Sequence, residues 1–138
     1  MLEGEVSAND PLVSVVDDDA SMRNSTCRLI RSFGIRAEAF GSAGEFLDSG
    51  RVESTACLIL DVRMPGMSGL ELQRKLTESG HRLPVIFVSA YGNGPEEEQA
   101  MRSGASDFLR KPVSERALIN AIEIALRRKF QNGERGNS

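Results

Sequence analysis

Five reactive or charged residues follow short apolar segments of this 138-residue sequence. Asp17 and Asp18 come directly after the first apolar segment, Asp61 ends the third, Ser89 ends the fourth and Lys111 follows the fifth. Carboxylates bind hard cations, a serine hydroxyl donates hydrogen bonds, and a lysine ammonium neutralises anionic groups. If the fold brings these side chains together, they can bind a metal ion and act on an anionic substrate.

The elements that must position these residues alternate between short apolar runs and longer amphipathic stretches. Short apolar runs predict buried strands, and apolar residues three to four positions apart predict helices. The predicted strands cover residues 11–17, 35–40, 56–61, 84–89 and 108–110, and the predicted helices cover residues 20–33, 42–49, 68–79, 96–103 and 114–129. Ser42 and Glu45 have the spacing of a capping box at the start of the second helix.

This alternation predicts a single α/β domain. It favours a parallel sheet with helices on both faces and right-handed crossovers. We predict a flavodoxin-like (βα)5 doubly wound sandwich, with a five-stranded parallel sheet of order 2-1-3-4-5. We assign residues 1–10 to a flexible N-terminus, 11–129 to the domain and 130–138 to a flexible C-terminal tail.

In that strand order Asp61 lies at the centre of the predicted site. The functional crevice of such a sheet lies beyond the carboxyl ends of its strands, which are roughly 4.8 Å apart. Asp17 and Asp18 then lie one strand away. Lys111 starts about two strand spacings away, roughly 10 Å, a gap that its flexible side chain can span.

Three carboxylates held close together repel one another unless a cation compensates them. Oxygen ligands favour Mg²⁺, and the sequence offers no cluster of Cys or His as a softer site. The three carboxylates carry −3, which Mg²⁺ and Lys111 bring to neutrality. A neutralised Asp61 can then accept a phosphoryl group as a nucleophile, because this transfer depends mainly on positioning and charge stabilisation. Ser89 can donate a hydrogen bond to a phosphoryl oxygen.

Composition excludes several other classes of function. The chain has 17 Lys and Arg against 20 Asp and Glu, for a net charge of −3, without a long block of either sign. This balance argues against nucleic acid as the main ligand. Cys27 and Cys57 lie inside apolar segments, which predicts reduced core thiols. We find no signal peptide and no membrane-length apolar segment, and we expect a soluble cytoplasmic protein.

Four stretches of the sequence resemble the receiver domains of two-component response regulators. They are VVDDDASMR at 15–23, LILDVRMPGMSGLEL at 58–72, VIFVSAYG at 85–92 and AMRSGASDFLRKPV at 100–113. The resemblance covers about residues 11–129 and is strongest to receivers of the nitrogen-fixation-regulator type. It implies a domain that receives a phosphoryl group from a histidine kinase or histidine phosphotransfer protein and controls a downstream effector or output domain.

The resemblance also implies a ligand set for Mg²⁺. Asp18 and Asp61 match direct ligands, the backbone carbonyl of Arg63 matches a third, and Asp17 matches a residue that acts through metal-bound water. The peptide bond between Lys111 and Pro112 matches one that is cis in the family.

A conformational switch is implied as well. A phosphoryl group on Asp61 would draw Ser89 inward, and the Phe108 ring would turn into the vacated space. The surface formed by the fourth helix, the fifth strand and the fifth helix would change with it. We expect this surface to bind a partner or a second copy of the chain. Arg63 and Tyr91 are hypothesised to shield the phosphorylated aspartate from water.

Two other functions stay open from the residues alone. A small Mg²⁺-dependent phosphohydrolase with an aspartyl-phosphate intermediate would share the nucleophile, the metal and the lysine. It would also need a cap that encloses substrate and a second acidic residue as general acid, neither of which the sequence offers. A non-phosphorylated interaction module would leave the acidic residues, the hydroxyl and the lysine unexplained. We therefore expect a phosphoacceptor that assists its own phosphorylation and dephosphorylation and is no metabolic enzyme.

Overall fold

The computed structural model describes residues 10–90 and 94–136, with side chains described as far as residue 128. The N-terminal segment expected to be flexible therefore lies outside the described residues except for Asp10, as do residues 137 and 138 of the expected tail. Strands and helices alternate along the described chain. They are β1 (Leu12–Val16), α1 (Ala20–Ser32), β2 (Arg36–Phe40), α2 (Ala43–Asp48), β3 (Thr55–Asp61), α3 (Gly69–Glu78), β4 (Val85–Ser89), α4 (Gly94–Arg102), β5 (Asp107–Arg110) and α5 (Glu115–Gly136).

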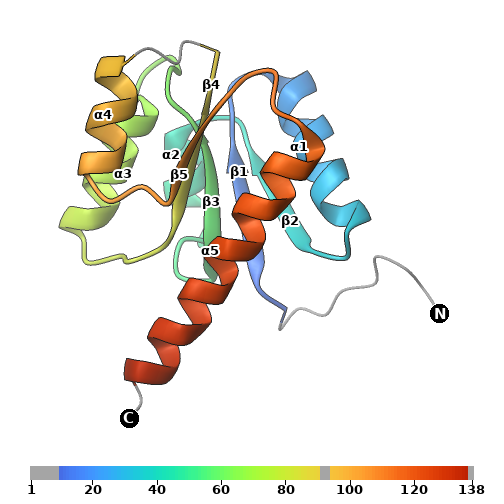
Figure 1. Ribbon diagram of the computed structural model, residues 1–138. Coiled ribbons are helices and arrows are strands. Elements are labelled where there is room, and N and C mark those ends of the chain that lie inside the picture. The colour runs from blue at the N-terminus through green and yellow to red at the C-terminus, as the bar shows by residue number, and fades with distance from the viewer. Residues whose placement is uncertain (1–9, 91–93, 137–138) are drawn as a thin grey trace.

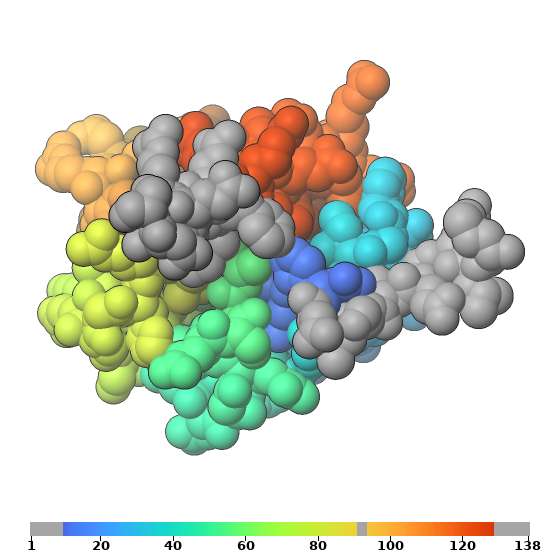
Figure 2. Space-filling view, turned by 90° about the horizontal axis from the view of Figure 1, so that it is seen from below, coloured from blue at the N-terminus to red at the C-terminus, as the bar shows by residue number. Residues whose placement is uncertain are grey.

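The five strands form one sheet in the order β2-β1-β3-β4-β5, and all neighbouring strands are parallel. This confirms the predicted flavodoxin-like arrangement. Because the strands run in the same direction, their carboxyl ends meet at one edge of the sheet (Figure 1). Figure 2 views the molecule from the opposite end, where β1 (blue) begins.

Side chains of the central strands alternate between the two faces of the sheet, as the two-residue repeat of a strand requires. Leu58 and Leu60 of β3 pack in the core that α2, α3 and α4 cover. Cys57 and Ile59, which alternate with these leucines along the strand, pack in the core that α1 and α5 cover. Burial of each such leucine or isoleucine stabilises the fold by roughly 1.5–3 kcal/mol. The two cores hold β3 rigidly from both sides, and Asp61 lies at its end (Figure 1).

Capping residues fix where the helices begin. Ser42 caps α2 by accepting a hydrogen bond from the backbone N–H of Glu45, as expected. The complete capping box lies at α3 instead, where Ser68 and Glu71 each accept a hydrogen bond from the other's backbone N–H. Such a box satisfies two N–H groups that have no partner within the helix. It therefore fixes the start of α3 just after the loop that follows Asp61.

Helix α5 is longer than the apolar pattern predicted. The prediction ended this helix at Lys129, whereas it continues to Gly136. The apolar repeat that signals a buried helix face ends near Leu126, but the residues that follow include several good helix formers. A helix that has already formed extends at little cost, so it can outlast its apolar face.

The two cysteines are both free and buried. Burial raises the pKa of the Cys57 thiol to about 12, which keeps it protonated at neutral pH. The structure therefore confirms the prediction that both are core thiols. Among the described residues, none of the helices has the length and apolar character needed to cross a membrane.

Candidate functional site

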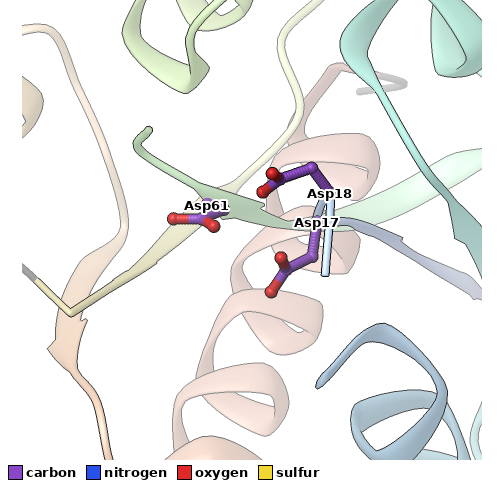
Figure 3. A group of neighbouring side chains, drawn as sticks. All are labelled: Asp17, Asp18 and Asp61. Carbon is purple, nitrogen blue, oxygen red and sulfur yellow. The ribbon is translucent and has the colours of Figure 1, made fainter. Parts of the chain in front are cut away.

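Three carboxylates meet at the carboxyl edge of the sheet. Asp17 and Asp18 follow β1, and Asp61 ends the adjacent strand β3 (Figure 3). Their register explains the meeting, because Val16 pairs with Leu60 and the next residue of each strand is an aspartate. One carboxylate oxygen from each residue lies within 4.8 Å of the others. The structure thus brings together the acidic residues that the sequence predicted.

Backbone hydrogen bonds hold the acidic turn after β1. The N–H of Asp17 donates to the carbonyl of Phe40 at 3.2 Å, which ties the turn to the end of β2. The N–H of Asp19 donates to the Asp17 carboxylate at 3.0 Å. Asp19 itself is the N-cap of α1 and accepts from the N–H of Met22. Asp17 is consequently buried and fixed, whereas Asp18 is exposed and open to ligands.

Lys111 reaches the carboxylates from the end of β5. Its ammonium nitrogen lies 3.3 Å from an Asp17 carboxylate oxygen and 3.6 Å from an Asp61 carboxylate oxygen. The backbone of the same residue is fixed by a 2.9 Å hydrogen bond from its N–H to the carbonyl of Ser89. The peptide bond to Pro112 is cis, as the resemblance implied. The Lys111 side chain therefore spans β4 and reaches Asp61, as predicted.

The site shifts the pKa of the Asp61 carboxyl. Burial raises its pKa from 3.8 to about 6, because desolvation penalises the ionised form. The Lys111 ammonium opposes this rise, the Asp17 carboxylate adds to it, and a hydrogen bond from the backbone of Arg63 opposes it. Three negative groups and one lysine leave a net charge near −2, which a divalent cation would balance.

Arg63 lies beside the acceptor, but its side chain points to a partner that the sequence did not reveal. The guanidinium donates two hydrogen bonds of 3.3 Å to the carboxylate of Glu96, in the first turn of α4. This ion pair connects the loop after Asp61 to α4. The metal-ligand role of the Arg63 carbonyl remains a prediction. Tyr91, the other residue hypothesised to shield the acceptor, lies outside the described residues.

Ser89 and Phe108 are both buried near the site. Ser89 ends β4 with no exposed surface, one position beyond Val88, which pairs with Asp61. Phe108 is 8% exposed, and its ring centroid lies 6.1 Å from that of Phe87. The turn of the Phe108 ring on phosphorylation remains a prediction.

Gly69 is a site residue that the sequence did not indicate. A Cβ atom at this position would overlap the carbonyl oxygen of Asp61 and lie 3.0 Å from its carbonyl carbon. The N–H of Gly69 donates to the carbonyl of Val62 at 2.8 Å, which closes the loop between β3 and α3. Glycine thus allows α3 to begin directly against the backbone of Asp61. The only sequence signal of this close approach was a glycine at the start of a predicted helix.

A cavity of about 220 Å³ opens beside the carboxylates, between α1, α5 and the sheet. Asp17, Asp61 and Lys111 line its polar end, and Met22 and Leu118 line its walls. The Asp61 side chain keeps 12% of its surface exposed. The arrangement combines three carboxylates that could hold a metal ion with a lysine ammonium.

A model of the response regulator receiver domain matches residues 13–123. The chain belongs to this family. This receiver is 45% identical over 123 residues to nodulation protein W of Bradyrhizobium diazoefficiens, and the match covers 89% of this chain and 54% of that protein. It is 43% identical over 125 residues to the response regulator TmoT of Ectopseudomonas mendocina, covering 91% and 57%. It is 40% identical over 121 residues to the transcriptional regulator FixJ of Azorhizobium caulinodans, covering 88% and 57%.

Solved structures agree with this membership. The response regulator StyR superposes with a TM-score of 0.86 at 44% identity, covering 93% of this receiver and 65% of that chain. FixJ-N superposes with a TM-score of 0.78 at 34% identity, covering 86% and 94%. The receiver spans about half the length of the curated relatives it matches. Membership favours the two-component receiver over the phosphohydrolase and the non-phosphorylated module.

Proposed function

We propose that this receiver takes a phosphoryl group on Asp61 from a histidine kinase or a histidine phosphotransfer protein. The observation that carries the proposal is the cluster of three carboxylates within 4.8 Å of one another, with the Lys111 ammonium 3.3 and 3.6 Å from two of them. The three carboxylates and the ammonium thus lie within reach of one another at one edge of the sheet. Preassembly of this kind is what phosphoryl transfer requires of a protein.

The donor set of the acidic cluster fits Mg²⁺. All three groups offer carboxylate oxygens, which hard divalent cations prefer, and Asp18 is exposed enough to leave room for metal-bound water. Asp18, Asp61 and the backbone carbonyl of Arg63 would hold the ion directly, and Asp17 would act through water. When bound, the ion supplies positive charge against the carboxylates and the incoming phosphoryl oxygens.

The transfer itself uses the residues of this chain. A carboxylate oxygen of Asp61 attacks the phosphorus of a phosphohistidine, the new O–P bond forms, and the P–N bond breaks with its electron pair going to the imidazole. Lys111 keeps its proton and stabilises the negative charge on the phosphoryl oxygens. The raised pKa of Asp61 makes its ionised form more basic than an ordinary carboxylate.

Ser89 and Phe108 provide the switch in this proposal. The Ser89 hydroxyl would donate a hydrogen bond to a phosphoryl oxygen once one is present. The Phe108 ring would then turn into the space that Ser89 leaves, so phosphorylation would shift the population between two arrangements. Reversing such an equilibrium fully takes about 5.5 kcal/mol of differential stabilisation.

The surface formed by α4, β5 and α5 is the proposed site of a homodimer or effector contact. The transcriptional and response regulators among the relatives are nearly twice as long as the match, so an output domain beyond the receiver is part of the proposal. Residues 11–129 are the proposed receiver unit. A cytoplasmic location follows from the cytoplasmic phosphoryl donors that this function requires.

The proposal is tested by incubation with acetyl phosphate, a small acyl phosphate, with and without Mg²⁺. Intact mass is followed for the wild type and for Asp61→Asn, with Asp48→Asn on the exposed end of α2 as the matched control. We expect a single phosphoryl adduct that requires Mg²⁺, is absent from Asp61→Asn and is unchanged in Asp48→Asn. An adduct that persists in Asp61→Asn would contradict the assignment of the acceptor.

A further inference from the structure

We propose that Arg23 is a positioning residue for the metal site. Its guanidinium fixes the peptide group from which Asp18 projects and thereby raises the affinity of the acidic cluster for Mg²⁺. This inference rests on the proposed function of that cluster. Arg23 lies in the first turn of α1, is partly buried, and was not among the residues that the sequence indicated.

The geometry places Arg23 on the backbone of the acidic turn. Its Nη1 atom donates to the carbonyl oxygen of Asp17 at 2.9 Å. That carbonyl belongs to the planar peptide group joining Asp17 to Asp18, so holding the oxygen fixes the plane from which Asp18 leaves. The other groups of the turn are held by the bond from Asp17 to Phe40 and the bond from Asp19 to Asp17. Arg23 supplies the restraint that acts directly on Asp18.

Arg23 acts on the turn without occupying a carboxylate oxygen that a metal ion would bind. A guanidinium stays protonated at any pH at which the protein is folded. Lys111 donates to an Asp17 carboxylate oxygen, whereas Arg23 donates to the Asp17 carbonyl on the other side of the turn. Arg23 therefore restrains the turn and leaves the carboxylate oxygens available to a metal ion.

The position of the guanidinium is restricted by the loop between β2 and α2. Gly41 lies so close that a Cβ there would be 3.4 Å from Arg23 Nη1 and 3.2 Å from a carboxylate oxygen of Glu45. The Arg23 side chain thus passes over Gly41, which has no side chain. A donor that is confined in this way loses little entropy when it orders its acceptor.

The test is a calorimetric titration of the full metal-free chain with Mg²⁺ at pH 7. The variants are Arg23→Met, which removes the donor and the charge, and Arg23→Lys, which keeps both in another shape. Arg28→Met, on an exposed position of the same helix, is the matched control. We expect the Kd for Mg²⁺ to rise roughly tenfold in Arg23→Met, as for other groups that orient metal ligands. We expect partial recovery in Arg23→Lys and no change in Arg28→Met.

A merely structural role predicts a different pattern. We expect Mg²⁺ to raise the melting temperature of Arg23→Met by less than it raises that of Arg28→Met, whatever the melting temperatures of the two metal-free variants. An unchanged Kd in Arg23→Met, or an equal loss in Arg28→Met, would overturn the role of Arg23. A wild-type chain that binds no Mg²⁺ would overturn the proposed function of the cluster itself, and the inference with it.

Discussion

Gly69 lies against the backbone of Asp61, and a Cβ atom at position 69 would overlap the Asp61 carbonyl oxygen. The acceptor strand and α3 can approach this closely only because position 69 has no side chain. Dense packing of backbone against backbone leaves no room for relaxation, so the acceptor is held by contacts that do not involve its own side chain.

We predict that Gly69→Ala destabilises the fold and displaces the acceptor. The added methyl group must push α3 away from β3, which costs about 3 kcal/mol for overpacking of this kind. Chemical denaturation measures the loss. Gly44→Ala is the control, because a Cβ at this exposed position in the first turn of α2 meets only the Ser42 hydroxyl, at 3.9 Å. Equal stability of the two variants would mean that the close approach is not rigid.

The raised pKa of Asp61 predicts how stability depends on pH without metal. The folded state holds the Asp61 proton up to about pH 6, whereas the unfolded state releases it near pH 4. The folded state therefore binds more protons between these values, and the free energy of unfolding falls as pH rises through this window. Asp61→Asn lacks the ionising group, so above pH 6 its free energy of unfolding should exceed that of the wild type by about 3 kcal/mol.

Denaturation with a chelator present at pH 4 and pH 7 measures this difference. The gap between Asp61→Asn and the wild type should be small at pH 4 and large at pH 7. Asp48→Asn, at an exposed position, should stay within about 0.5 kcal/mol of the wild type at both values. A gap for Asp61→Asn that does not change with pH would show that burial does not raise this pKa.

Lys111→Met should slow phosphoryl uptake while leaving the fold intact. The ammonium forms ion pairs with the Asp17 and Asp61 carboxylates, and it opposes the rise in the Asp61 pKa. Loss of one group that stabilises developing charge typically slows a reaction on the order of 100-fold. The initial rate with acetyl phosphate at saturating Mg²⁺ measures the effect. Lys75→Met, on the exposed face of α3, should match the wild type, and equal rates for both variants would remove Lys111 from the mechanism.

Ser89→Ala should separate phosphorylation from its readout. Ser89 is fully buried at the end of β4, and its hydroxyl is the proposed partner of the phosphoryl group. We expect phosphoryl uptake to stay within about tenfold of the wild type, since one neutral hydrogen bond contributes about 1 kcal/mol. Amide chemical shifts of α4, β5 and α5 should no longer change on phosphorylation. Ser89→Thr keeps the hydroxyl and should keep the response; a full response in Ser89→Ala would exclude this switch.

The sequence predicted the parallel strands and the three carboxylates because both depend on patterns local to each element, and the strand order followed from the flavodoxin-like fold. Apolar runs ending in Asp17 and Asp61 reveal buried parallel strands, and parallel strands necessarily bring their ends together. The Arg63 to Glu96 ion pair could not be predicted, because long side chains choose partners from positions that no spacing rule connects. The role of Gly69 could not be predicted for a related reason, because close approach of two backbones depends on how two elements pack in space.

The measurement that tests the central claim most directly locates the phosphoryl group by chemistry rather than by mutation. Borohydride reduces an aspartyl phosphate to homoserine, so the wild-type chain is treated with acetyl phosphate and Mg²⁺, reduced, digested and sequenced by mass spectrometry. We predict homoserine at position 61 and at no other aspartate, and none when Mg²⁺ is withheld. Homoserine at position 17 or 18, or a phosphoryl adduct that borohydride does not reduce, would contradict Asp61 as the acceptor.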